Sequence, residues 1–264
     1  MSRFKVAFID VDNTLYDHSM RRYPPKSIEA VKRMAEQGIK VFICSARPYD
    51  SLKRFGCFDL GIPWSGYIAS SGGIGVVGEA LIHEEIMDSD DMFALAKKFK
   101  ELGLTAELVT PNDRYMIAPP NEYSRAYHFV YRDETDKISN YHGEKSTGFL
   151  LFAPKEFDEQ IIAVRPNLVY FRFHEYGVDI MPSMHSKGAT ITEVLNYLGV
   201  PKEQSIGFGD DFQDLPMADA TGCFVCMGNG REEVKEGAHY VAPTVSEDGL
   251  AKAIYDLVFE EEML

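Results

Sequence analysis

Residues 4–15 read Phe-Lys-Val-Ala-Phe-Ile-Asp-Val-Asp-Asn-Thr-Leu. This stretch is a short apolar run that ends in two carboxylates spaced i, i+2, with Thr14 two residues further on. Because Lys5 is the only charge before Ile9, the run is typical of a buried strand in a parallel sheet. Ligands of open α/β sheets bind at the carboxyl ends of the strands, where Asp10 and Asp12 lie. Two acids without a basic neighbour in the sequence repel each other there unless they share a metal or a proton.

Strand and helix patterns alternate at both ends of the chain. Helices are expected where an apolar stripe is followed by glycine or begins after proline, and strands where short apolar runs lie between them. The expected strands cover residues 4–10, 39–44, 67–70, 205–209, 223–227 and 239–241, and the main helices 26–37, 187–198, 211–219 and 248–260. This alternation predicts an α/β protein with a Rossmann-like, doubly wound parallel sheet that is covered on both faces.

The middle of the chain has a different pattern. Residues 83–183 carry most of the aromatic side chains and show one clear helix pattern near residues 89–102. Strand patterns over residues 146–153 and 168–174 give this segment an α+β character. We therefore expect residues 83–183 to form an inserted α+β domain, and residues 1–82 and 184–264 to form the core together.

Composition excludes several classes of function. Lys and Arg total 27 and Asp and Glu total 41 in 264 residues, so the formal charge is −14. Such an acidic chain is a poor partner for nucleic acid or for an anionic membrane. No apolar run approaches the ~18 residues of a membrane span, and the N-terminus carries no signal-peptide pattern. We expect a cytoplasmic monomer whose four cysteines are buried free thiols.

The polar residues at the expected strand ends suit phosphoryl transfer. A carboxylate can attack phosphorus, and a second one can protonate the leaving oxygen and then activate water. Magnesium binds carboxylates and phosphate oxygens, while a hydroxyl and an ammonium hold the remaining phosphoryl oxygens. The candidates are Asp10 and Asp12 after the first strand, Ser45 after the second, Lys187 at a helix start, and Asp210, Asp211 and Asp214 after a fourth strand.

Four motifs in order give the chain a close resemblance to the haloacid dehalogenase superfamily. More narrowly, it resembles the Cof-type sugar-phosphate phosphatases with a type IIB cap, over almost its full length. The matching residues are Asp10, Asp12 and Thr14 in the first motif, Ser45 in the second, Lys187 in the third, and Gly209, Asp210 and Asp214 in the fourth.

The resemblance implies a role for each matching residue. Asp10 would be the nucleophile that forms an aspartyl-phosphate, and Asp12 the general acid and base. Ser45 and Lys187 would bind the transferring phosphoryl group. Mg²⁺ would be held by Asp10, by the backbone carbonyl of Asp12 and by Asp210, with Asp214 supporting the metal site. The insert would be the cap that closes over the substrate.

Several positions depart from the family pattern or have two interpretations. Ser71 and Gln213 each stand where the family often has asparagine, which affects fine substrate contacts and not the class of reaction. Arg47 either reaches a substrate phosphate or forms a surface ion pair. Gly72 either lets the backbone approach the substrate or simply forms a turn. We include Ser45, Arg47, Ser71, Gly72 and Lys187 in the expected substrate-binding set.

The functional hypothesis is Mg²⁺-dependent hydrolysis of a small phosphomonoester, with sugar phosphates as the expected class. One alternative is a phosphomutase of the same superfamily, which returns the phosphoryl group to a sugar. The large insert argues against that alternative. A second alternative is a non-enzymatic sensor of a metabolite phosphate. A missing nucleophile or acid would favour a sensor, and both Asp10 and Asp12 are present.

Overall fold

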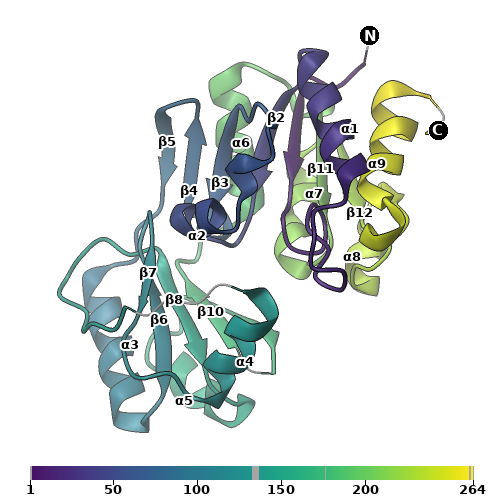
Figure 1. Cartoon of the computed structure of the whole chain (residues 1–264). Coiled ribbons are helices and arrows are strands. Elements are labelled where there is room, and N and C mark those ends of the chain that lie inside the picture. The colour runs from purple at the N-terminus through teal and green to yellow at the C-terminus, as the bar shows by residue number, and fades with distance from the viewer. Residues whose placement is uncertain (1, 133–136, 176, 262, 264) are drawn as a thin grey trace. The chain divides into compact units, whose positions relative to one another are not determined.

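The computed structural model describes residues 2–132, 137–175, 177–261 and 263. Contacts divide the chain into two compact units (Figure 1). The core unit contains the residues up to Arg47, Gly56–Glu84 and the residues from Ser186 onward. The second unit contains Pro48–Phe55 and Glu85–His185. The core unit is therefore built from both ends of the chain.

The core unit contains an eight-stranded sheet of order β13-β12-β11-β1-β2-β3-β4-β5. The strands from β13 to β3 are parallel, while β4 and β5 form an antiparallel hairpin at one edge. The strand bounds are β1 Val6–Ile9, β2 Lys40–Cys44, β3 Gly66–Ala69, β4 Ile74–Val77, β5 Ala80–Glu84, β11 Ser205–Gly209, β12 Cys223–Cys226 and β13 Tyr240–Val241. The predicted fold class is confirmed, and the β4–β5 hairpin is an addition that the parallel pattern did not predict.

Helices cover both faces of this sheet. Alternate residues of β1 face opposite ways, so Ala7 and Ile9 join one apolar cluster and Val6 and Phe8 join the other. The first cluster packs under α1 (Pro25–Glu36) and α9 (Gly249–Ile254). The second cluster packs under α6 (Lys187–Leu198), α7 (Pro216–Ala220) and α8 (Glu232–Glu236). Two layers of helix therefore bury the strands and leave the strand ends as the place where polar side chains gather.

The second unit is an α+β domain with its own core. Its antiparallel sheet has the order β7-β6-β8-β10-β9. Helices α3 and α5 pack on one face of that sheet and α4 on the other. The bounds are α2 Tyr49–Arg54, α3 Ser89–Leu102, β6 Thr105–Val109, β7 Arg114–Met116, α4 Glu122–Tyr131, β8 Gly148–Phe152, α5 Asp158–Ile162, β9 Val169–His174 and β10 Gly177–Met181.

Short 3-10 turns and one π turn complete the secondary structure. The 3-10 turns are Cys57–Asp59, Ser70–Gly72, Lys155–Phe157, Lys202–Gln204, Phe212–Asp214 and Val245–Glu247, and the π turn is Tyr255–Phe259. The helix expected over residues 211–219 is in fact a 3-10 turn followed by α7. Within the described residues, every helix is too short or too polar to cross a membrane.

Two phenylalanines on α3 test the core of the second unit. Phe99 is fully buried and packs edge-on against Phe149, whereas Phe93 is 49% exposed. Replacing Phe99 with alanine should lower the free energy of unfolding by about 3–5 kcal/mol, because a cavity replaces the ring. Phe93→Ala is the control and should cost less than about 1 kcal/mol. Urea unfolding followed by circular dichroism measures both, and equal losses would contradict this assignment of the core.

Candidate active site

Polar residues from five segments of the core unit meet at one edge of the sheet. The strand register pairs Ile9 of β1 with Ile43 of β2 and with Phe208 of β11, so these strands end at similar heights. The residues that follow the ends are therefore neighbours in space although they are distant in the sequence. They are Asp10 after β1, Ser45 after β2, Ser70–Gly72 after β3 and Asp210 after β11, with Lys187 as the first residue of α6.

An ammonium group bridges two carboxylates at the centre of this site. Lys187 Nζ lies 2.7 Å from Asp10 Oδ1 and 2.6 Å from Asp214 Oδ1, and all three side chains are buried. Burial alone would lower the pKa of Lys187, but the Asp10 and Asp214 carboxylates outweigh it and raise that pKa well above its usual value. The lysine is therefore charged throughout the physiological pH range.

The second oxygen of Asp214 shapes the loop after β11. Asp214 Oδ2 accepts hydrogen bonds from the backbone N–H groups of Asp210 (2.9 Å) and Asp211 (3.1 Å). Gly209 makes room for this carboxylate, since a Cβ atom at Gly209 would lie 2.4 Å from Asp214 Cβ. Asp214 thus fixes the backbone from which the side chain of Asp210 projects.

The three carboxylates suit a hard divalent cation. Ligand oxygens of Asp10, Asp210 and Asp214 all lie within 4.8 Å of one another. Burial, and then the neighbouring carboxylates, raise the pKa values of Asp10 and Asp210 well above normal. A cation placed among these oxygens would relieve that repulsion, and carboxylate oxygens are the ligands that Mg²⁺ prefers. The donor set therefore fits the expected metal.

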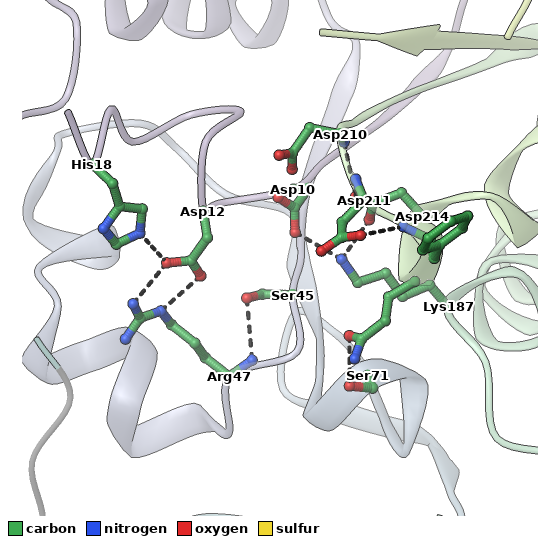
Figure 2. A network of polar contacts seen from close by, with 12 residues as sticks. Asp10, Asp12, His18, Ser45, Arg47, Ser71, Lys187, Asp210, Asp211 and Asp214 are labelled. Carbon is green, nitrogen blue, oxygen red and sulfur yellow. Dashed lines mark hydrogen bonds and ion pairs between the residues drawn. The ribbon is translucent and has the colours of Figure 1, made fainter. Parts of the chain in front are cut away.

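Asp12 faces a different set of partners in this conformation. Its carboxylate accepts two hydrogen bonds from Arg47, from Nε at 2.9 Å and from Nη2 at 2.7 Å, and lies 2.6 Å from His18 Nε2. Figure 2 shows Asp12 turned toward Arg47 and His18, while Asp10 points to Lys187. Burial raises the pKa of Asp12, but Arg47 and His18 outweigh it and hold that pKa far below its usual value.

His18 is a site residue that the sequence analysis missed. It lies six residues after Asp12, and its ring also packs edge-on against Tyr16, with 4.9 Å between the centroids. A histidine shortly after a strand-end aspartate is a weak signal, because the loop decides where its ring points. Of the two interpretations of Arg47, the structure shows an ion pair, and its partner is Asp12 inside the site.

The remaining expected substrate-binding residues lie beside this cluster. Ser45 is fully buried, and its Oγ accepts a hydrogen bond from the Arg47 backbone N–H at 3.2 Å. Ser71 Oγ donates to Gln213 Oε1 at 3.0 Å. Gly72 packs against the start of α6, where a Cβ atom would lie 2.3 Å from the carbonyl group of Ser186. Each of the predicted site residues thus lies at the same sheet edge. The side chains of Asp12 and Arg47, however, are paired with each other.

Comparison with known proteins agrees with the fold. The family of haloacid dehalogenase-like hydrolases matches residues 7–254. The chain is 30% identical over 257 residues to the Bacillus subtilis strain 168 protein named "Putative phosphatase YkrA", covering 96% of this chain and 97% of that protein. It is 26% identical over 270 residues to "5-amino-6-(5-phospho-D-ribitylamino)uracil phosphatase YitU" of the same organism, covering 92% and 94%.

A solved structure described as "HAD Subclass IIB Sugar Phosphatase BT4131" has the same fold, with a TM-score of 0.84 and 24% identity over 96% of this chain and 98% of that one. The chain therefore belongs to the haloacid dehalogenase-like hydrolase family. Within that family it is a phosphatase of the Cof type, which confirms the resemblance inferred from the four motifs.

Two glycines of β11 test how the loop after that strand is built. A Cβ atom at Gly209 would collide with Asp214, whereas one at Gly207 would meet the terminal methyl of Met217 at 3.0 Å, which can move. Gly209→Ala should cost about 1–3 kcal/mol of stability and most of the activity, because Asp214 must shift. Gly207→Ala is the matched control and should lower both the stability and the activity less than Gly209→Ala does. Urea unfolding and phosphatase assays decide, and equal effects would refute the role given to Gly209.

Proposed function

We propose that this phosphatase hydrolyses small phosphomonoesters, chiefly sugar phosphates, with the help of Mg²⁺ and through an aspartyl-phosphate on Asp10. The observation that carries the proposal is the buried Lys187 ammonium between the Asp10 and Asp214 carboxylates, with Asp210 beside them. Such a site offers a carboxylate nucleophile next to fixed positive charge, which is what an anionic phosphate requires.

The first step is attack by an Asp10 oxygen on the phosphorus of the ester. The bond between phosphorus and the ester oxygen breaks, and the leaving oxygen takes a proton from Asp12 and departs as an alcohol. In the second step Asp12 takes a proton from water, and that water oxygen attacks the phosphorus of the aspartyl-phosphate. Inorganic phosphate leaves and the Asp10 carboxylate is restored.

Lys187 and Ser45 serve both steps. The Lys187 ammonium neutralises charge on the phosphoryl oxygens, and the Ser45 hydroxyl donates a hydrogen bond to one of them. Asp10, the backbone carbonyl of Asp12, and Asp210 would hold Mg²⁺, with Asp214 supporting them. Bound Mg²⁺ reduces the repulsion between an anionic nucleophile and an anionic substrate.

Asp12 must leave its present partners before it can act as an acid. While Arg47 and His18 hold it, the depressed pKa keeps its carboxylate ionised and therefore unable to donate a proton. A substrate phosphate competes for Arg47, because guanidinium groups bind phosphate and carboxylate in the same bidentate way. Substrate binding would thus release Asp12 toward the reacting group.

The proposed substrate class has support from the relatives. YitU is named for a phosphorylated ribityl compound, and BT4131 is described as a sugar phosphatase, so both names place the phosphate on a polyol or sugar. We assign to the insert, residues 83–183, the role of a cap that selects the substrate, and to residues 1–82 and 184–264 the catalytic role. Arg47, Ser71 and Gly72 would contact the substrate from the core.

The overall charge and the cysteines support the remaining expectations. A charge of −14 favours a small substrate that is held by local cations over a nucleic acid or an anionic membrane. Cys44, Cys57, Cys223 and Cys226 are buried free thiols, as expected in a reducing compartment such as the cytoplasm. We further propose that the protein is a monomer.

Asp10→Asn tests the nucleophile. An amide is a very weak nucleophile, so the variant should release less than about one thousandth of the phosphate that the wild type releases from a panel of sugar phosphates, pyridoxal phosphate and nucleotides. Chelation of Mg²⁺ by EDTA should abolish release by the wild type and restored Mg²⁺ should recover it. Asp219→Asn, on an exposed aspartate, is the control. Full activity of Asp10→Asn would refute the mechanism.

Arg47→Lys tests the proposed contact of Arg47 with the substrate phosphate. Lysine keeps the charge but cannot donate from two nitrogens to one phosphate group, so kcat/KM should fall roughly tenfold or more. Arg54→Lys is the matched control, because Arg54 forms an exposed ion pair with Asp113 at 3.2 Å. Unchanged kinetics of Arg47→Lys would show that bidentate binding of the substrate phosphate by Arg47 plays no part in turnover.

A further inference from the structure

The loop between β3 and β4 contacts three segments of the site, which are the residues after β2, the start of α6 and the residues after β11. The backbone N–H of Ser70 donates to the carbonyl of Arg47 at 3.0 Å, and that of Ser71 to the carbonyl of Ser45 at 3.1 Å. Gly72 lies against the residues that begin α6, with Lys187 N 2.7 Å from where its Cβ would be. The Ser71 side chain reaches Gln213, next to Asp214. This loop therefore connects segments of the site that are distant in the sequence.

The loop holds an unfavourable backbone conformation. Ser70, Ser71 and Gly72 have φ angles of 51°, 55° and 108°, so two serines in succession occupy the left-handed region. A residue other than glycine pays for this conformation unless its surroundings hold it there. A hydrogen bond from Ser71 Oγ to Gln213 Oε1 ties this conformation to the segment carrying Asp210 and Asp214.

We propose that Ser71 and Gln213 form one positioning unit whose combined side-chain length sets the distance between the β3–β4 loop and the metal-binding segment. Serine is one heavy atom shorter than asparagine along the path to the bond, and glutamine is one methylene longer. A short donor is thus matched by a long acceptor. The proposal rests on the proposed function, since it deepens the account of the same site.

The unit positions groups and does not react. Gln213 precedes Asp214, whose carboxylate holds both Lys187 and the Asp210 backbone. Ser71 holds the carbonyl of Ser45 through its own N–H. A change of one atom in either side chain therefore alters the spacing between the phosphate-binding loops and the carboxylates that would hold Mg²⁺.

An exchange of lengths tests the unit. Ser71→Asn alone makes the pair too long in a site where Ser71 is only 7% exposed, and Gln213→Asn alone makes it too short. Each should lower kcat/KM and raise the half-activating Mg²⁺ concentration about 3- to 10-fold, as expected for one lost hydrogen bond. The double variant restores the combined length and should return both values to within about twofold of the wild type.

Two measurements do not depend on turnover. The melting temperature of the metal-free protein should fall in each single variant and recover in the double variant. The increase in melting temperature that added Mg²⁺ causes should likewise be smaller in each single variant and return to the wild-type value in the double variant. Backbone strain alone predicts the opposite for Ser71→Asn, because asparagine tolerates the left-handed region better than serine and would stabilise the loop. Gln37→Asn, on an exposed glutamine of the core unit, controls for the substitution itself.

The outcomes separate this inference from the proposed function. If the wild type releases phosphate but the two single effects add in the double variant, or neither single variant has an effect, the positioning unit is refuted. If the wild type releases no phosphate from any ester, the proposed function fails, and the melting temperatures still decide on the pair. Should asparagine at position 71 prevent folding, the cycle of Ser71→Ala and Gln213→Ala gives the same decision through its non-additivity.

Discussion

The ammonium of Lys187, held between the carboxylates of Asp10 and Asp214, is the interaction on which the rest of the site depends. Three carboxylates cannot all stay ionised in a buried space unless positive charge balances them. The lysine supplies part of that charge, and a divalent cation would supply the remainder. The site is consequently built to attract cations and the anionic groups that accompany them.

This pairing constrains the elements around it. Lys187 is the first residue of α6, so the helix must begin at the sheet edge, where Ser186 caps it by accepting a hydrogen bond from the Ala189 N–H at 3.1 Å. Gly188 then lets α6 approach α7, since a Cβ atom there would lie 2.3 Å from the carbonyl oxygen of Pro216. Gly188 and Gly209 thus make room for the ion pair between Lys187 and Asp214, because their lack of a side chain lets the neighbouring backbone and side chains come close.

The same sheet edge holds two distinct charge environments. Burial, and then the neighbouring carboxylates, raise the pKa of Asp10, whereas Asp12, two residues later, lies against Arg47 and His18, which lower its pKa. Two aspartates in one motif are thereby given different properties by their surroundings, which is the usual basis for assigning different chemical roles to them. In the proposed mechanism, the conformation with Asp12 paired to Arg47 would be a resting arrangement, because an acid must release its proton and a carboxylate held in this way has none.

Strong local patterns allowed much of this to be predicted. The bounds of β11, α3 and α6 agree with their sequence patterns, because apolar periodicity and glycine stops are local signals. The β4–β5 hairpin and α4 were not expected. The hairpin strands are short and at the sheet edge, and only the two residues between Val77 and Ala80 separate them. Aromatic residues lie on both the buried and the exposed face of α4, so its sequence shows no clear apolar stripe.

The sequence by itself determined which residues gather at the sheet edge, since parallel strands end at the same side and each motif follows a strand or opens a helix. Only the tertiary structure decided which of these residues touch. Arg47 could be assigned to the substrate or to a surface partner, and its contact with Asp12 depends on how two loops pack. Ser71 and Gln213 are 142 residues apart, and two separate departures from a family pattern became one hydrogen bond. Side-chain direction and long-range contact arise from packing between distant segments, which no local pattern records.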